Sequence, residues 1–176
     1  VGGTGKTPHT EMILRELLND DIWGGRNLAI LSRGYKRSSK GFQQVPFKGS
    51  AKEFGDEPMQ MKNKFPHVTV AVEKYRKEGS QCHCNQELHQ SSKKARKCLQ
   101  KDMPKADLII LDDAFQHRAV KPTVSIVLVD FSRPTFKDHL LPMGRLRDLP
   151  ERIGAADIVI VTKCPSYIDE YEKAEW

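Results

Sequence analysis

The sequence lacks any apolar run that approaches the ~20 residues a helix needs to cross a bilayer. It has no internal repeat and shows no secretory signal peptide, because it opens on small polar residues. Cysteine is scarce, and the spacing of the four cysteines is no disulfide framework for 176 residues: Cys82, Cys84, Cys98 and Cys164. We therefore expect a globular chain whose length suits one domain, 1–176, with its own core.

Basic residues exceed acidic ones, 29 against 23, which gives a formal net charge of +6. A positive chain suits an anionic partner: a nucleotide, a phosphorylated substrate, a nucleic acid or an anionic membrane face. Charge alone does not choose among these partners. The sequence has no basic patch interleaved with aromatic residues, so we predict no nucleic-acid partner.

The first residues carry the strongest chemical signal. Gly5, Lys6 and Thr7 are typical of the end of a phosphate-binding P-loop, and a run of small residues precedes them: Gly2, Gly3 and Thr4. Glycines let backbone N–H groups curl around a phosphate, Lys6 reaches the outer phosphates of ATP, and the Thr7 hydroxyl ligates Mg²⁺. A protein that uses ATP works in the cytoplasm, where cysteines stay reduced.

Part of the P-loop pattern falls outside the sequence. The glycine expected five residues before Gly5 would precede Val1, and so would the strand that feeds the loop. We therefore expect the chain to be a piece of something longer. The alternative is a glycine-rich turn that merely opens a helix, since Pro8 suits a first helical turn and apolar residues follow at helical spacing.

Five apolar runs predict the strands of a parallel sheet, at residues 28–31, 68–72, 108–111, 124–130 and 158–161. Helices and loops alternate with them, which predicts an α/β fold, a P-loop NTPase-like parallel sheet flanked by helices. Ligands bind beyond the carboxyl ends of such strands, where Arg33 and Tyr35 follow the first run. An ordinary exposed loop explains these two residues equally well.

Two acidic pairs are candidates for the chemistry. Asp112 and Asp113 end the third apolar run, as the Mg²⁺-binding carboxylate of a P-loop NTPase does. Asp56 and Glu57 precede Pro58 at an expected helix start, where acids also serve as ordinary helix caps.

Two polar stretches carry weaker signals. Residues 77–105 include a group of possible metal ligands whose spacing fits no standard zinc pattern, so we expect a polar surface insertion: Cys82, His83, Cys84, His89 and Cys98. The basic stretch from Lys36 to Lys52 predicts a mobile loop or small hairpin.

Taken together, five segments resemble the tetraacyldisaccharide 4'-kinase family of Gram-negative bacteria, from Val1 to about Thr162. They occur in this order: residues 2–8, residues 32–35, residues 55–58, residues 112–117 and residues 140–147. Ala114 stands where the family usually has glycine, a small departure.

The resemblance implies a lipid kinase in lipid A biosynthesis. It implies transfer of the ATP γ-phosphate to the 4'-hydroxyl of a tetraacyl disaccharide 1-phosphate, by an enzyme peripheral on the cytoplasmic face of the inner membrane. Asp56 matches the family's catalytic Asp, Glu57 is its support, and Lys6 acts on the phosphates. His117 and Arg147 match positions near substrate and phosphate. The family's membrane-anchoring segment and the His that partners its catalytic Asp lie outside this sequence.

Three other functions stay open from the sequence. One is a P-loop NTPase that drives a partner and has no phosphoryl acceptor. Another is a basic nucleic-acid-binding module. The third is a truncated, inactive remnant of the kinase.

Overall fold

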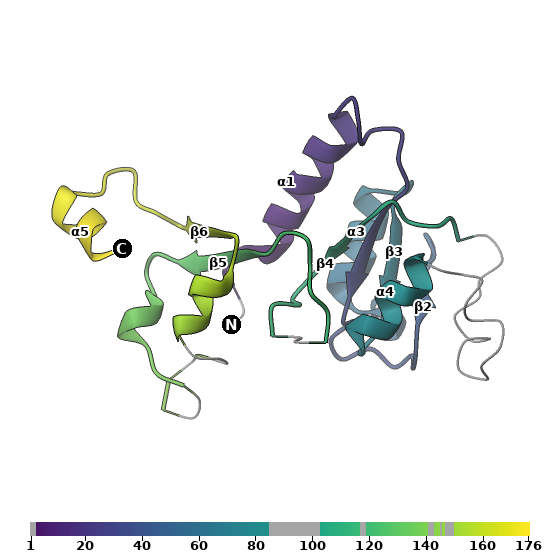
Figure 1. Cartoon of the computed structure of the whole chain (residues 1–176). Helices are drawn as coiled ribbons and strands as arrows, with labels where there is room; N and C mark the ends of the chain where they lie inside the picture. The colour runs from purple at the N-terminus through teal and green to yellow at the C-terminus, as the bar shows by residue number, and fades with distance from the viewer. Residues whose placement is uncertain (1–2, 85–102, 117–118, 141–142, 145, 147–149) are drawn as a thin grey trace. The chain divides into compact units, whose positions relative to one another are not determined.

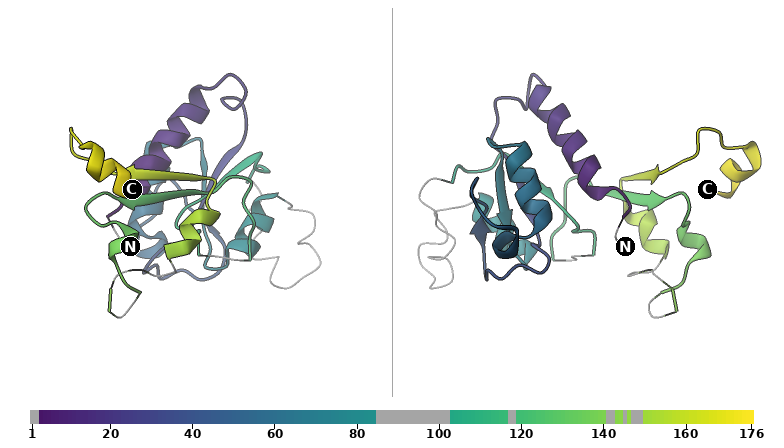
Figure 2. Two further views of the ribbon diagram at one scale, coloured as in Figure 1. Left: turned by 60° about the vertical axis from the view of Figure 1, so that its left-hand side comes forward. Right: turned by 180° about the vertical axis from the view of Figure 1, so that it is seen from behind.

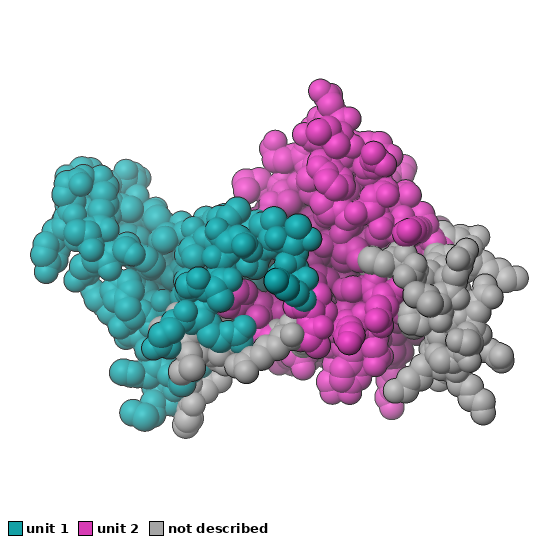
Figure 3. Space-filling view, viewed as in Figure 1, with its two compact units in different colours: residues 1–6, 121–176 teal, residues 7–120 magenta. Residues whose placement is uncertain are grey.

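The structure, a computed structural model, describes residues 3–84, 103–116, 119–140, 143–144, 146 and 150–176. It contains two compact units (Figure 3). We call residues 7–120 the larger unit and residues 1–6 with 121–176 the smaller unit. The prediction of one domain over 1–176 stays a prediction.

The larger unit is built on a four-stranded sheet with the order β2-β3-β1-β4 (Figure 1). β1 (Leu28–Ser32) is central and pairs in parallel with β3 (Thr69–Val72) and β4 (Leu108–Leu111). The short β2 (Gln43–Gln44) adds an antiparallel edge beside β3. The expected parallel α/β sheet is thus confirmed, with strand ends within about two residues of those predicted.

The three parallel strands are mostly apolar because helices cover both faces of the sheet. Leu28 and Ile30 of β1 pack with Leu14 of α1 (Lys6–Asn19) and Met59 of α3 (Asp56–Lys64). Leu31 points to the other face, where Cys82 of α4 (Arg76–Cys84) joins it. Figure 2 shows α3 and α4 on either side of the strands.

A short helix, α2 (Ala51–Phe54), leads directly into α3. The Ser50 side chain accepts a hydrogen bond from the Glu53 N–H, which caps α2 at its start. Phe54 is buried in the core beside Met59, so the α2–α3 junction is fixed to the sheet. The basic stretch from Lys36 to Lys52 contains β2 and the start of α2. Since β2 pairs with β3 and not with another strand of the stretch, this segment forms no hairpin of its own.

The smaller unit contains a parallel pair, β5 (Ile126–Asp130) and β6 (Ile158–Thr162). Two 3-10 helices, η3 (Thr135–Lys137) and η4 (Pro150–Ala155), and the helix α5 (Glu170–Glu175) complete it. The Trp176 ring stacks on Phe131, with 5.5 Å between ring centroids, and so joins the end of α5 to the end of β5. Within the described ranges, every helix is too short or too polar to cross a membrane.

Candidate functional site

The carboxyl ends of three strands meet at one edge of the larger unit's sheet. The Glu73 N–H donates to the Ser32 carbonyl at 3.0 Å, which joins the residues that follow β3 and β1. The Asp112 N–H donates to the Leu31 carbonyl at 3.1 Å, which joins the end of β4 to β1. This edge is the one at which parallel α/β sheets bind ligands.

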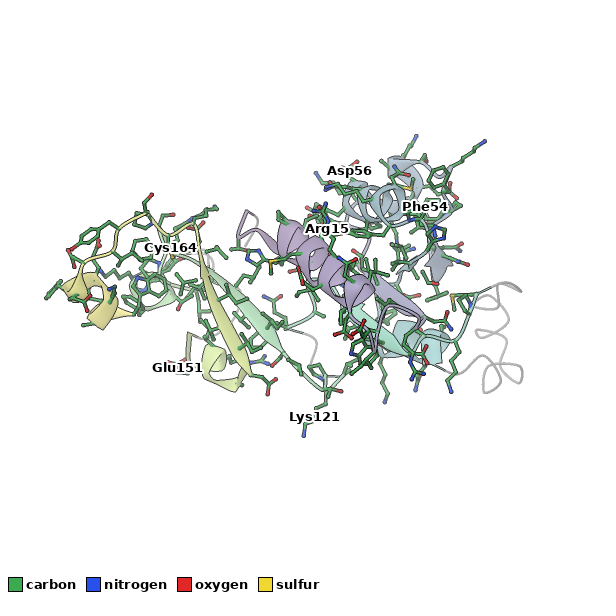
Figure 4. The ribbon with its side chains drawn as sticks, turned by 90° about the horizontal axis from the view of Figure 1, so that it is seen from above. Arg15, Phe54, Asp56, Lys121, Glu151 and Cys164 are labelled. Carbon is green, nitrogen blue, oxygen red and sulfur yellow. The ribbon has the colours of Figure 1, made fainter. Side chains whose placement is uncertain are left out.

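Two of the predicted motifs touch each other at this edge. Gly34 and Gly55 both have positive φ, +64° and +99°, and a Cβ on Gly55 would lie 3.3 Å from the Gly34 Cα. Asp56 and Glu57, both exposed, then form the first turn of α3 (Figure 4 labels Asp56). Arg33 and Tyr35 are exposed after β1, where the sequence places them, and the acidic pair lies at the helix start that Pro58 predicts.

Residues 3–7 are the described part of the predicted phosphate loop. Gly3 and Gly5 have φ of +84° and +85°, which only glycine adopts readily, and α1 starts directly at Lys6. The carbonyl of Thr4 accepts a hydrogen bond from the Thr162 Oγ1 at 3.1 Å. This bond ties the loop to the carboxyl end of β6 inside the smaller unit. Thr7 is the first residue of the larger unit and sits in the first turn of α1.

The acid pair follows β4 in an uncommon backbone conformation. Asp113 has a φ of +50°, which is rare for a residue with a side chain. Its side chain is exposed and that of Asp112 is half-buried. Such backbone strain gathers at functional sites.

Arg76 is a residue of this edge that sequence reasoning missed. It is 1% exposed and donates from Nη1 to the Glu73 carbonyl at 3.2 Å and from Nη2 to the Asp112 carbonyl. Burial lowers the pKa of its guanidinium, and the charges of Asp112 and Asp113 oppose this effect. The only signal in the sequence is its place four residues after a strand, which many surface arginines share.

An ion pair joins α1, which begins at the predicted phosphate loop, to α3, which begins at Asp56. Glu11 of α1 accepts from the Lys64 ammonium, 2.7 Å from each carboxylate oxygen, and from the Gln60 amide at 2.8 Å. Both partners lie on α3. The hydrogen bond from Lys64 is the main cause that holds the pKa of Glu11 below its ordinary value.

Asp130 anchors a charged cluster in the smaller unit. It is 3% exposed and accepts from the Lys163 ammonium at 2.7 Å, from the Ser132 hydroxyl at 2.7 Å and from the Arg133 guanidinium at 3.2 Å. Lys163 and then Ser132 keep the pKa of the carboxyl far below its usual range. No sequence pattern indicates this cluster, because 33 residues separate the two members of its shortest ion pair.

The structure brings together only part of the predicted site. Asp56, Asp112 and Asp113 belong to the larger unit, whereas Lys6 belongs to the smaller one. Three predicted residues lie outside the described residues: Gly2, His117 and Arg147. Residues 85–102, most of the expected polar surface insertion, also lie outside them.

Thr7, Asp112 and Asp113 have the chemistry of a magnesium site. Within the described residues, no group of three or more His, Cys, Asp and Glu side chains could hold a metal. Magnesium in nucleotide sites needs fewer protein ligands, because waters and phosphate oxygens complete its octahedron. A hydroxyl and one or two carboxylates therefore fit the metal of a Mg·ATP complex.

Comparisons with known proteins agree with the sequence resemblance. The family model described as tetraacyldisaccharide-1-P 4'-kinase matches residues 1–175. The tetraacyldisaccharide 4'-kinase of Phocaeicola vulgatus is 47% identical over 168 residues, which cover 96% of this chain and 41% of the relative. The enzyme of the same name from Bacteroides thetaiotaomicron is 46% identical, with 96% of this chain and 39% of the relative covered.

A solved structure also matches, the "apo" form of LpxK from Aquifex aeolicus in complex with ATP. It is 34% identical, superposes with a TM-score of 0.70, and the match covers 97% of this chain and 49% of that one. The chain thus spans about two fifths of the length of the curated relatives described above and about half of the solved structure.

Proposed function

The chain belongs to the tetraacyldisaccharide-1-P 4'-kinase family, and we propose that the protein transfers the γ-phosphate of ATP to the 4'-hydroxyl of a tetraacyl disaccharide 1-phosphate. The observation that carries the proposal is the phosphate loop. Its glycines have the positive φ that a backbone wrapped around phosphate requires, and a helix starts directly behind it. The family match, which runs over residues 1–175, includes this loop.

Phosphoryl transfer depends on positioning and on neutralising charge. In our proposal Lys6 contacts the outer phosphates, and the N–H groups of residues 3–6 with the α1 dipole hold their charge. Thr7 with Asp112 or Asp113 would hold Mg²⁺, which supplies charge neutralisation of the phosphate oxygens. Both acids follow the strand beside β1, at the ligand-binding edge.

Asp56 is the proposed general base that takes the proton from the 4'-hydroxyl. Its exposure supports this role, because the acceptor must reach it. A carboxylate is a weak base for an alcohol, so proton transfer accompanies phosphoryl transfer. Glu57 supports Asp56 from the same helical turn. His117 and Arg147 are proposed near the substrate and the phosphates.

We further propose a peripheral location on the cytoplasmic face of the inner membrane. The stretch between β1 and α2 supports it, because this stretch exposes three lysines and two large aromatic residues: Lys36, Lys40, Lys48, Tyr35 and Phe47. Lysines attract anionic lipid headgroups, and aromatic rings favour the interface.

The direct test is transfer of labelled γ-phosphate from ATP to tetraacyl disaccharide 1-phosphate by the full product of the gene. We expect acceptor-dependent ATP consumption that Lys6→Ala abolishes. Hydrolysis at the same rate without acceptor would instead favour an NTPase that drives a partner. No ATP binding at all would favour an inactive remnant.

A further inference from the structure

Arg76 is among the most deeply buried side chains of the chain, with 1% of its surface exposed. A buried arginine is rare unless its charge is paired and its N–H groups are bonded. Its neighbours are therefore informative. The negative charges of Asp112, Asp113 and Glu73 stabilise the guanidinium of Arg76. The positive charge of Arg33 destabilises it.

The hydrogen bonds of Arg76 reach the residues that follow β3 and β4, on either side of β1. Nη1 donates to the Glu73 carbonyl beyond β3, and Nη2 donates to the Asp112 carbonyl beyond β4. β1 lies between β3 and β4 in the sheet. One rigid planar group thus fixes the carboxyl ends of two strands relative to each other.

The bonded carbonyl belongs to the turn that carries the acid pair. The next residue, Asp113, has the left-handed φ of +50°. A side-chain bond to the preceding peptide therefore restrains a conformation that a free chain rarely adopts. The acids would repel each other, and the guanidinium beside them offsets that repulsion.

Close packing fixes Arg76 itself. Gly79 lies one turn further along α4, and a Cβ there would come within 2.7 Å of Leu31 Cδ2 and 3.1 Å of Glu73 Cβ. α4 therefore lies closer to β1 than a helix with a larger residue at this position could.

The Nε of Arg76 is buried without a hydrogen-bond partner in the described part of the chain. Such an orphan donor is costly, which argues that the charge is kept for a purpose other than stability.

We infer that Arg76 is a positioning residue of the nucleotide site: it holds the Asp112 carbonyl and thereby fixes the turn from which Asp112 and Asp113 reach the metal of Mg·ATP. The inference rests on the proposed function. Arg76 touches neither nucleotide nor acceptor in this scheme. Its effect passes through the backbone of Asp112.

The test measures ATP binding by calorimetry to the full product of the gene, once with Mg²⁺ and once with EDTA. The readout is the gain in affinity that Mg²⁺ provides. In Arg76→Gln we expect this gain to fall by about tenfold or more, with metal-free ATP binding within about twofold of the wild type. Arg76→Lys, which keeps the charge but not the two-carbonyl geometry, should also lose most of the gain.

Lys62 provides a matched control. Its ammonium donates to the carbonyls of Pro66 at 2.8 Å and Val68 at 3.1 Å, so it too is a partly buried cation that holds two carbonyls. It does so before β3 begins, at the opposite end of the strand from Glu73. Lys62→Gln should lower the melting temperature and leave the Mg²⁺-dependent gain unchanged.

Each outcome decides the inference. A folded Arg76→Gln with the full Mg²⁺-dependent gain would overturn it. So would failure of both Arg76 variants to fold while Lys62→Gln folds, because Arg76 would then be a residue of the fold rather than of the site. A wild-type protein without any Mg²⁺-dependent gain would overturn the proposed function as well, and is thereby distinguished from the first outcome.

Discussion

Gly34 and Gly55 pack so closely that a Cβ on Gly55 would lie 3.3 Å from the Gly34 Cα, with the Pro58 ring at 3.4 Å. Gly55 also has a φ of +99° and a ψ of 154°, a combination that is essentially limited to glycine. Through this contact the end of β1 sets the position of the first turn of α3. The geometry of Asp56 therefore depends on two residues that have no chemistry of their own.

Gly55→Ala should destabilise the larger unit by about 1–3 kcal/mol and lower kcat, because it strains the backbone and displaces Asp56. Gly41→Ala is the matched control. Gly41 also has a positive φ, +71°, but a Cβ there would meet nothing within 4 Å. Urea unfolding of both variants measures the cost of backbone strain at each glycine, and kinase kinetics measures the effect of displacing Asp56. Equal losses of kcat in the two would contradict a role for the Gly34–Gly55 contact.

Asp56→Asn should lower kcat by about 10²–10⁴-fold while the Kd for ATP stays unchanged, because the amide cannot accept the proton of the acceptor hydroxyl. Lys6→Ala should weaken both turnover and ATP binding. Steady-state kinetics with calorimetry checks both. Retained turnover in Asp56→Asn would remove this residue as the base, and Glu57→Gln shows whether its neighbour acts instead.

Glu11 should make the stability of the larger unit depend on pH. Lys64 lowers the pKa of Glu11 in the folded chain from the ordinary value of 4.5. The ionised carboxylate therefore stabilises the fold at neutral pH, and this contribution is lost as pH falls below the ordinary value and through the folded one.

Glu11→Gln should remove that pH dependence and about 1–3 kcal/mol of stability at neutral pH, since a charge-assisted pair between α1 and α3 is lost. Urea unfolding between neutral and acid pH measures it. A double-mutant cycle with Lys64→Met gives the coupling energy between the two side chains. A coupling energy near zero would mean that the contact does not contribute to stability.

The Asp130 carboxyl should remain ionised well below the ordinary pKa of 3.8, because Lys163 and Ser132 bond its charged form. A pH titration of its carboxyl carbon signal by NMR checks this. Lys163→Met should raise the pKa toward the ordinary value. In the wild type the stabilising effect is present above the ordinary value and disappears only as pH falls through the lowered one. An unshifted titration would contradict the ion pair.

Gly79→Ala should destabilise the larger unit by about 1–3 kcal/mol in spite of alanine's better helix propensity, because the added methyl meets fully buried Leu31. The neighbouring Ser80→Ala is the control. The Ser80 hydroxyl is buried without a hydrogen-bond partner among the described residues, so its removal should leave stability unchanged or raise it. The melting temperature should therefore fall in Gly79→Ala and should rise or stay the same in Ser80→Ala.

The central strands could be predicted from sequence because they are buried on both faces and read as unbroken apolar runs, as Leu28–Leu31 does. The start of α3 was predictable from Pro58 in its first turn. Arg76 was not, because its importance comes from the approach of α4 at Gly79, which no local pattern reports. The contact of Glu11 with Lys64 joins residues 53 positions apart, so only the packed helices reveal it.

The hydrogen bond between Thr162 and Thr4 crosses 158 positions of sequence. During synthesis, Thr4 therefore leaves the ribosome long before Thr162, its hydrogen-bond partner, has been made. Contacts of such separation form late in folding, because a long intervening chain must first close. We therefore expect the β1-centred sheet to form before the predicted phosphate loop acquires this restraint, which must wait until β6 has emerged.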